Sequence, residues 1–230
     1  MPRGLLLFRE RPGRFAYYPT PSSGLPDIVY VAWCENIAVW MRGRWGAPYG
    51  PGREGMEKPR GRPEVVFRGR VLSVRVDPVL AKSGPATREV VERPSAVAIV
   101  AETAADEVVI VRQFRWAVRQ SLAEFPAGLV DAGELPMAAA RRELQEETGY
   151  TAEHWRPVYR YFTSPGYSTE MIHLYFASGL RAGPTRLDPD EEVAVELWDR
   201  RQVRDYLSKS PPSNGILLTG LLWWLRRVSF

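Results

Sequence analysis

Residues 128–150 read Gly128-Leu-Val-Asp-Ala-Gly-Glu134-Leu-Pro-Met-Ala-Ala-Ala-Arg-Arg142-Glu-Leu-Gln-Glu-Glu-Thr-Gly149-Tyr150, and this stretch organises the interpretation of the whole chain. Pro136 suits a first helical turn, because proline lacks the N–H that this turn leaves unpaired. Residues 137–145 are all strong helix formers, and Gly149 suits the left-handed position that ends a helix. The stretch therefore predicts a loop, one helix and a sharp stop.

The predicted helix carries a concentration of negative charge. Glu143, Glu146 and Glu147 stand at i, i+3 and i+4 and share one face. Another side carries apolar residues suited to a core, namely Met137, Ala140 and Leu144. Like charges at this spacing repel by a few tenths of a kcal/mol per pair, so the arrangement calls for a compensating cation. Carboxylate oxygens favour Mg²⁺ or Mn²⁺. The alternative interpretation is a solvated acidic helix face.

The spacing of this stretch resembles the signature of a known family. Glu134 follows Gly128 after five residues, and seven residues later comes Arg142-Glu-Leu-x-Glu-Glu-x-Gly-Tyr150. This pattern is that of the Nudix box, so the chain resembles the Nudix hydrolases; only Tyr150 departs from the pattern, since its position is usually aliphatic. The resemblance implies metal-assisted attack of water on a diphosphate linkage, with Mg²⁺ as the expected ion and Mn²⁺ as the alternative.

The resemblance also implies roles for individual residues. Glu143 and Glu147 are the expected principal metal ligands, with Glu146 as a further ligand or partner and the carbonyl of Ala127 as one more oxygen. Arg142 is the expected cation that orients these carboxylates, since its planar fork suits bidentate pairing. Glu134 has the least defined role. The expected general base is Glu192, then Glu191, in the acidic loop 188–192, for which the competing interpretation is a solvated acidic turn.

Flanking segments resemble one subgroup, the ADP-ribose pyrophosphatases. Pro165 lies 16 residues after Gly149 in a Pro-Gly-x-Ser-x-Glu run that ends at Glu170. Three upstream motifs also resemble this subgroup: Arg88-Glu-Val-Val-Glu-Arg-Pro94, Val111-Arg-Gln-Phe-Arg115 and Glu124-Phe-Pro-Ala-Gly128. The resemblance implies a homodimer with the substrate between subunits. Expected substrate-binding residues are Arg88 and Glu92 near the adenosine, Arg115 near the diphosphate, Pro165 in its loop, and Glu170 near the terminal ribose. A simple cross-strand pair is an equal alternative for Arg88 and Glu92.

The pattern along the chain predicts an α+β fold with three parts. Residues 1–60 form an irregular extension rich in Pro, Gly and Arg. Residues 61–94 form an antiparallel β meander with strands at 64–70, 71–76 and 86–93, broken at Gly69, at Asp77-Pro78 and at residues 83–85. Residues 95–230 form the Nudix domain, a mixed β-sheet sandwiched between helices. Codons for residues 52–55 permit a ribosome-binding sequence before Met56, so we expect Met56 to be the natural start.

Composition narrows the class of protein. The formal net charge is +4, but residues 1–60 hold nine basic and five acidic residues, whereas residues 61–230 hold 22 of each. The body is therefore balanced, which argues against a nucleic-acid surface. The single cysteine, Cys34, excludes an internal disulfide and favours a reducing cytoplasm. No apolar run reaches the roughly 18 residues that a membrane span needs.

These observations leave three functional hypotheses. The first is metal-dependent hydrolysis of ADP-ribose to AMP and ribose 5-phosphate, as the resemblance implies. The second keeps the mechanism but changes the substrate to another nucleoside diphosphate sugar, such as ADP-glucose or GDP-mannose. The third is a Nudix-fold module that senses ADP-ribose without cutting it, which the presence of Glu143, Glu146 and Glu147 disfavours.

Overall fold

A computed structural model describes residues 8–11, 14–16, 57–185, 193–209, 211 and 213–227. The chain divides into two compact units, Met1–Gly52 and Arg53–Phe230. Within the first unit, β1 (Phe8–Arg11) pairs antiparallel with β2 (Arg14–Ala16). Cys34 and Met56 lie outside the described residues. All other elements belong to the second unit.

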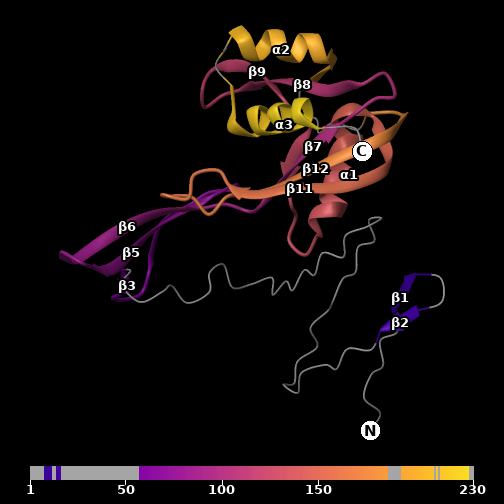
Figure 1. Cartoon of the computed structure of the whole chain (residues 1–230). Helices are drawn as coiled ribbons and strands as arrows, with labels where there is room; N and C mark the ends of the chain where they lie inside the picture. The colour runs from indigo at the N-terminus through magenta and orange to yellow at the C-terminus, as the bar shows by residue number, and fades with distance from the viewer. Residues whose placement is uncertain are drawn as a thin grey trace. The chain divides into compact units, whose positions relative to one another are not determined.

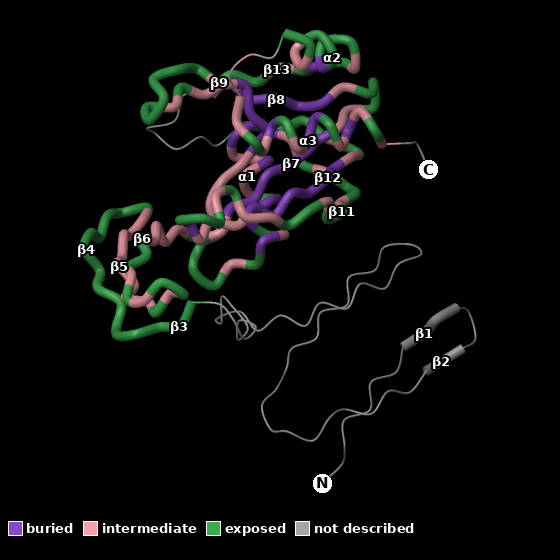
Figure 2. Tube along the Cα trace, turned by 60° about the vertical axis from the view of Figure 1, so that its left-hand side comes forward, coloured by how far each residue is buried: buried purple, intermediate pink, exposed green. Residues whose placement is uncertain are grey.

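A mixed four-stranded sheet forms the centre of the second unit (Figure 1). Its strands in spatial order are β10 (Ala127–Leu129), β7 (Ala96–Ala101), β12 (Met171–Ala182) and β11 (Tyr150–Phe162). The β7–β12 pair is parallel and the other two pairs are antiparallel. Every residue of β7 is buried, as Figure 2 shows by its purple trace, because side chains on both faces of this strand are covered.

Helices cover the two faces of this sheet. On one face, Val97 and Ile99 pack with Ala140 and Leu144 of α1 (Pro136–Thr148). On the other face, Ala98 and other alternate residues pack against α3 (Gly215–Arg226). Strand alternation thus sends successive side chains to two separate cores. The predicted sheet between helices is confirmed.

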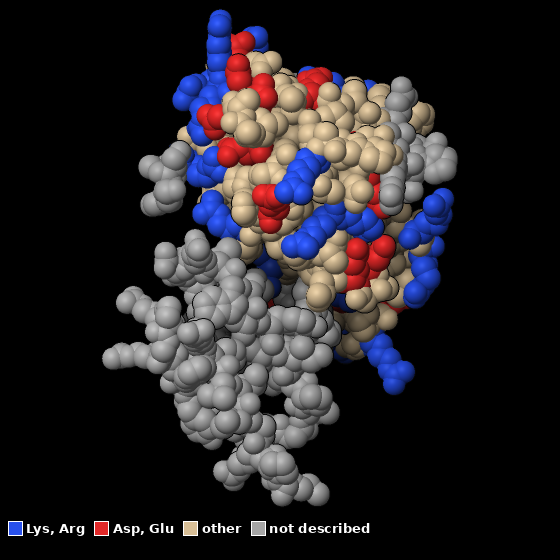
Figure 3. Space-filling view, turned by 90° about the vertical axis from the view of Figure 1, so that its right-hand side faces the viewer, with Lys and Arg blue, Asp and Glu red and all other residues tan. Residues whose placement is uncertain are grey.

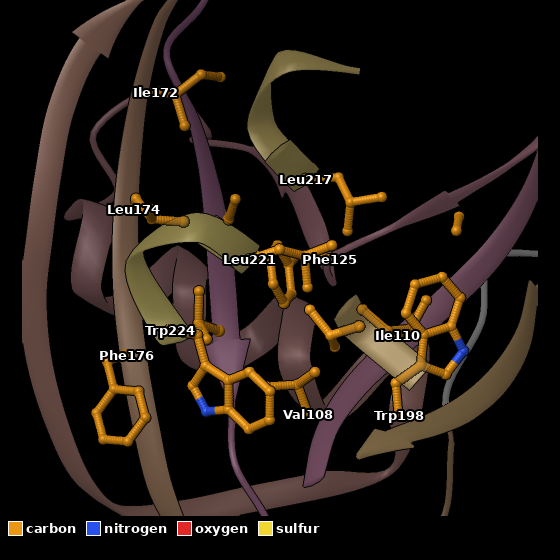
Figure 4. Packing of buried hydrophobic residues seen from close by; sticks show 14 of the residues in the cluster. Val108, Ile110, Phe125, Ile172, Leu174, Phe176, Trp198, Leu217, Leu221 and Trp224 are labelled. Atoms are coloured by element: carbon orange, nitrogen blue, oxygen red, sulfur yellow. The ribbon is translucent and has the colours of Figure 1, made fainter. Parts of the chain in front are cut away.

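A second sheet completes the larger core. Its strands in spatial order are β13 (Val193–Asp199), β8 (Glu107–Arg115) and β9 (Gln120–Glu124), and α2 (Arg200–Lys209) follows β13. Figure 4 shows Trp224 and Leu221 of α3 packed with Val108 of this sheet and Phe176 of the central one. Trp224 is fully buried, and its indole N–H donates to Glu102 over 2.5 Å. The two sheets and α3 therefore share one core.

The meander forms a separate antiparallel sheet, and one of its predicted boundaries is wrong. Its strands are β3 (Lys58–Pro59), β4 (Glu64–Arg68), β5 (Ser73–Ala81) and β6 (Gly84–Glu92). Strand β5 runs through Asp77-Pro78, where the sequence predicted a break. On one edge of β5, β4 pairs with it up to Val76 and β3 from Val79, which leaves a gap at position 78; on the other edge Pro78 lies opposite Thr87 of β6. The Pro78 carbonyl accepts from the Arg60 N–H on the first edge, so the proline nitrogen faces that edge as well. The missing N–H of proline therefore costs no ladder bond there.

Burial in the meander differs sharply from burial in the rest of the unit. No residue of β3–β6 is buried, so the meander has no core of its own. It exposes a set of large apolar side chains, each more than 40% accessible: Val65, Val66, Phe67, Val71 and Leu80.

The described surface carries both signs of charge, as the balanced composition of residues 61–230 indicates. On the face that Figure 3 shows, basic and acidic side chains are interspersed over the described surface. Among the helices of the described residues, none is long and apolar enough to cross a membrane.

Candidate active site

Helix α1 begins and ends where the sequence predicted. Pro136 occupies its first turn, and Gly149 ends it with a φ of 72°, a left-handed conformation that glycine adopts without strain. Its buried side carries Ala139, Ala140 and Leu144 against the sheet. Glu147 also belongs to this buried side, with 4% of its surface exposed. The three carboxylates therefore do not form one acidic face separate from the apolar side. The buried carboxylate of Glu147 instead meets the polar backbone of a strand.

This backbone is the start of strand β10. The backbone N–H of Ala127 donates to Glu147 Oε2 over 3.0 Å. A charge-assisted bond of this kind favours the ionised carboxylate and fixes its orientation. Residues 127 and 147 of the expected metal site are thus brought together.

Arg142 gathers the remaining acidic residues of the motif. Its Nε and Nη2 donate to the two oxygens of Glu134 over 3.1 and 3.0 Å, and Nη2 also donates to the carbonyl of Leu129. Its Nη1 donates to Glu143 Oε1 over 2.7 Å and to Glu146 Oε2 over 2.9 Å. The hydrogen bonds with Glu134 raise the pKa of Arg142 and lower the pKa of Glu134. One guanidinium therefore neutralises part of the charge on three carboxylates.

Gly128 shapes the space beside Glu143. A Cβ atom built on Gly128 would lie 2.0 Å from both Cδ and Oε1 of Glu143. No side chain other than hydrogen fits there while the Glu143 carboxylate keeps its place. The glycine that opens the motif is thus explained by close approach and needs no special backbone angle.

The donor set fits a hard divalent cation. Glu143, Glu146 and Glu147 supply carboxylate oxygens, and the carbonyl of Ala127 lies on the strand that Glu147 contacts. Gly128 leaves room for the Glu143 carboxylate beside that strand. Within the described part of the chain, no three His, Cys, Asp or Glu side chains converge on a common metal position. Arg142, bonded to both Glu143 and Glu146, explains how these carboxylates are held instead.

The meander residues expected to bind substrate have other partners. Arg88 forms an ion pair with Glu57, donating from both Nε and Nη2. Glu92 accepts from Arg75 over 2.7 Å and from Ser73. Both Arg88 and Glu92 lie on β6 and do not pair with each other, but Glu92 makes the cross-strand contact of the alternative interpretation, since Arg75 and Ser73 belong to the neighbouring strand β5. Each has its own partner on another segment.

The loop 163–170 is fastened to the end of β6. The backbones of Val91 and Tyr167 are joined by a 2.7 Å hydrogen bond, and Thr169 N–H donates to the carbonyl of Val91. Glu170 is engaged through both oxygens, with Arg93 at 2.9 Å and with the hydroxyl of Thr163 at 2.8 Å. Sequence reasoning missed Arg93 and Thr169, whose partners are 76 and more residues away. Pro165 lies in the same loop.

Arg115 has a buried partner that sequence reasoning also missed. Its Nε and Nη2 donate to the two oxygens of Glu124 over 2.8 and 2.7 Å. The hairpin register places Glu124 opposite Val111 and Arg115 opposite Gln120, so the pair runs diagonally along one face of the hairpin.

The expected bases Glu191 and Glu192 lie outside the described residues, which resume at Val193.

Neither histidine is assigned to the carboxylate site of α1. His154 is exposed on β11. His173 is buried on β12, and burial lowers its pKa to about 4, with a further contribution from the charge of Arg160. A neutral imidazole is therefore the stable form of His173 near neutral pH.

Comparisons with known proteins show which proteins this chain is similar to. The model of the NUDIX domain matches residues 92–216. The chain is 42% identical over 135 residues to a methanol dehydrogenase activator of Bacillus methanolicus, covering 58% of this chain and 73% of that protein. It is 42% identical over 163 residues to an ADP-ribose pyrophosphatase of Mycobacterium tuberculosis, covering 69% and 79%. A solved structure of an ADP compounds hydrolase superposes with a TM-score of 0.65 at 24% identity, covering 74% of this chain and 94% of that one.

Proposed function

Because the chain belongs to the Nudix hydrolase family, we propose that it hydrolyses ADP-ribose to AMP and ribose 5-phosphate with the help of a divalent cation. The observation that carries the proposal is the complete acidic motif on α1, with Glu147 fixed by the Ala127 N–H and Glu143 seated against Gly128. The substrate follows from relatives named for ADP-ribose hydrolysis, which include a protein from Bacillus subtilis that is 37% identical over 137 residues.

In this proposal Glu143 and Glu147 are the principal metal ligands, and Glu146 and the Ala127 carbonyl complete the set. The bound cation, Mg²⁺ first and Mn²⁺ as the alternative, neutralises diphosphate charge and lowers the pKa of the attacking water. Arg142 supports this arrangement by compensating part of the charge of Glu143 and Glu146 and by limiting where their carboxylates lie.

The reaction itself needs one proton acceptor. A water oxygen attacks one phosphorus of the diphosphate, the bridging P–O bond breaks, and the two phosphate products separate. We assign removal of the water proton to Glu192, or to Glu191 in its place, because both belong to the acidic run 188–192 of the sequence and a carboxylate can act as base. Arg115 is assigned to the diphosphate, since an arginine fork suits its oxygens.

The meander residues and the loop 163–170 are assigned to the rest of the substrate. Glu170 is held from two sides by Arg93 and Thr163, which suits a carboxylate that must accept hydrogen bonds from a ribose at a fixed position. Arg88 and Glu92 are assigned to the adenosine half, on a sheet that is fastened to the same loop by Val91. Pro165 belongs to that loop.

A homodimer is part of the proposal. The meander exposes Val65, Val66 and Phe67, each at least 42% accessible, and it buries no residue of its own. An exposed apolar sheet of this kind is stabilised when a second subunit covers it. Sedimentation at micromolar concentration tests this part, and a monomer there contradicts it. We also propose a cytoplasmic location, which suits a chain with a single cysteine.

One experiment tests the proposed activity. Purified protein is incubated with ADP-ribose, ADP-glucose and GDP-mannose, each with Mg²⁺, with Mn²⁺ and with EDTA, and the nucleoside monophosphate released is quantified. We expect the highest kcat/KM for ADP-ribose, with activity lost in EDTA. A higher kcat/KM for another sugar nucleotide reassigns the substrate, and binding of ADP-ribose without any product identifies a sensing module instead.

A further inference from the structure

The pair formed by Arg115 and Glu124 is unusual in how its two members are exposed. The side chain of Glu124 is 9% exposed, whereas that of Arg115 is 41% exposed. Both oxygens of Glu124 accept from the guanidinium, through Nε and Nη2, at 2.8 and 2.7 Å. A buried carboxylate therefore holds a cation whose side chain is partly exposed.

Strand alternation places this pair on the side of the catalytic helix. Val109 packs in the core that contains Ala140 and Leu144 of α1, while Val108 and Ile110 pack in the other core. Arg115 has the parity of Val109 along β8, and no register shift interrupts the strand. Glu124 is paired with Val111 and therefore lies on that same face. Both members of the pair thus lie on the face of the second sheet that looks toward α1.

Glu124 is also rigidly connected to the carboxylate site. It ends β9 three residues before Ala127, whose N–H donates to Glu147. Between them, the carbonyl of Pro126 accepts from the N–H of Ile99 on the fully buried β7. The backbone that follows Glu124 is therefore bonded to the central sheet and to helix α1.

We propose that Glu124 is a positioning residue for diphosphate binding, because its buried carboxylate fixes the fork of Arg115 in the orientation that receives the substrate. The proposal rests on the proposed function in assigning Arg115 to the diphosphate. A long arginine side chain loses rotamer freedom when it binds a ligand, and a partner that has already fixed it reduces that loss.

Two effects of Glu124 on substrate binding oppose each other. Its negative charge reduces the attraction of Arg115 for a diphosphate, whereas its bidentate contact orients the N–H donors. Orientation dominates here, since Arg115 is partly solvated and its charge is screened, while hydrogen bonds to phosphate oxygens depend steeply on direction. Removing the charge of Glu124 is therefore expected to weaken substrate binding.

The same strand supplies a matched control. Arg112 on β8 pairs with Glu196 on β13 at 2.6 Å, and the Arg112 side chain is also 41% exposed. Arg112 has the parity of Val108 and Ile110, so this pair lies on the opposite face of the sheet from Arg115. Glu196→Gln breaks an ion pair on the face turned away from α1, in which the carboxylate is 35% exposed and also accepts from the Trp198 indole N–H.

The experiment is a double-substitution cycle on steady-state kinetics. Glu124→Gln, Arg115→Ala, their combination and Glu196→Gln are assayed on ADP-ribose at a temperature at which circular dichroism shows all four folded. We expect Glu124→Gln to raise KM about tenfold with kcat changed less than threefold, and Glu196→Gln to change KM less than twofold. In the Arg115→Ala background, Glu124→Gln is expected to change KM less than twofold, because it acts through Arg115.

Four outcomes would overturn the proposal. They are an unchanged or lowered KM in Glu124→Gln, a loss confined to kcat or to the melting temperature, effects of the two substitutions that multiply independently, and an equal KM change in the Glu196→Gln control. If the wild-type protein instead prefers another diphosphate compound, the proposed substrate fails, and the same cycle is run on that compound to test Glu124 separately.

Discussion

Gly128→Ala isolates the geometric requirement of the carboxylate site. Gly128 lies in strand β10, paired with Val97, and alanine can adopt that backbone. The added Cβ would stand 2.0 Å from Cδ of Glu143, whereas ordinary contact begins at 3.4 Å, so the carboxylate must retreat by about 1.4 Å. Misplacement of a catalytic group by 1 Å costs on the order of a hundredfold in rate. We expect kcat to fall by about that factor.

Stability should respond differently from activity. The far end of Glu143 can move, and replacing glycine by alanine stiffens the unfolded chain, so Tm should stay within about 5 °C of the wild type. The Mg²⁺ concentration for half-maximal rate should rise at least about tenfold, because a displaced ligand weakens the metal site. Thermal melts and a metal titration of the initial rate measure both.

Gly215→Ala provides the control for this experiment. Gly215 begins α3, and a Cβ there would meet nothing within 4 Å. It should leave kcat and the metal requirement unchanged. If Gly128→Ala keeps kcat within threefold and needs no more Mg²⁺ than Gly215→Ala, Glu143 is not a ligand held against Gly128, and the reasoning fails.

Four further predictions concern other parts of the chain. Glu147→Gln should lower kcat by roughly a hundredfold, since it removes a ligand charge at nearly constant size; a rate within threefold of wild type removes Glu147 from the metal site. Glu192→Gln should lower kcat more than it raises KM, and the same pattern in Glu191→Gln would identify its neighbour as the base. The free energy of unfolding should fall by up to about 3 kcal/mol between pH 6.5 and 4, because His173, with a pKa of about 4, stays neutral when folded but gains a proton when unfolded; His173→Asn should abolish this component in urea melts. Deletion of residues 1–52, a separate compact unit, should leave kcat and the dimer intact, and a fall in Tm beyond about 5 °C would show that this unit supports the rest.

Much of the fold was predictable because it is encoded locally. Helix α1 follows from a proline at its start, a run of helix formers and a glycine at its end, and all three signals agree. The buried strand β7 follows from an unbroken apolar run. The error at Asp77-Pro78 arose because a proline is judged by its own strand, whereas its cost depends on whether a neighbouring strand needs the missing N–H.

The site was less predictable, because its side chains are paired across long sequence separations. The spacing of the motif predicts which residues carry charge, but it does not show that Glu147 faces the buried backbone of Ala127. Likewise, nothing near Glu170 in sequence indicates that Arg93 is its partner. Only the packing of the meander against the loop 163–170 creates that contact. Residue type is local information, whereas the partner is a property of the fold.

The charge balance of α1 shows how these two kinds of information combine. Spacing alone indicates that Glu143, Glu146 and Glu147 repel and that a cation must compensate them. Arg142 on the same helix already bonds Glu143 and Glu146, and the Ala127 N–H bonds Glu147. Folding of the helix therefore does not depend on an external cation for its charge balance. Spacing identifies which side chains carry the charge, whereas the fold identifies the hydrogen-bond donors that compensate it.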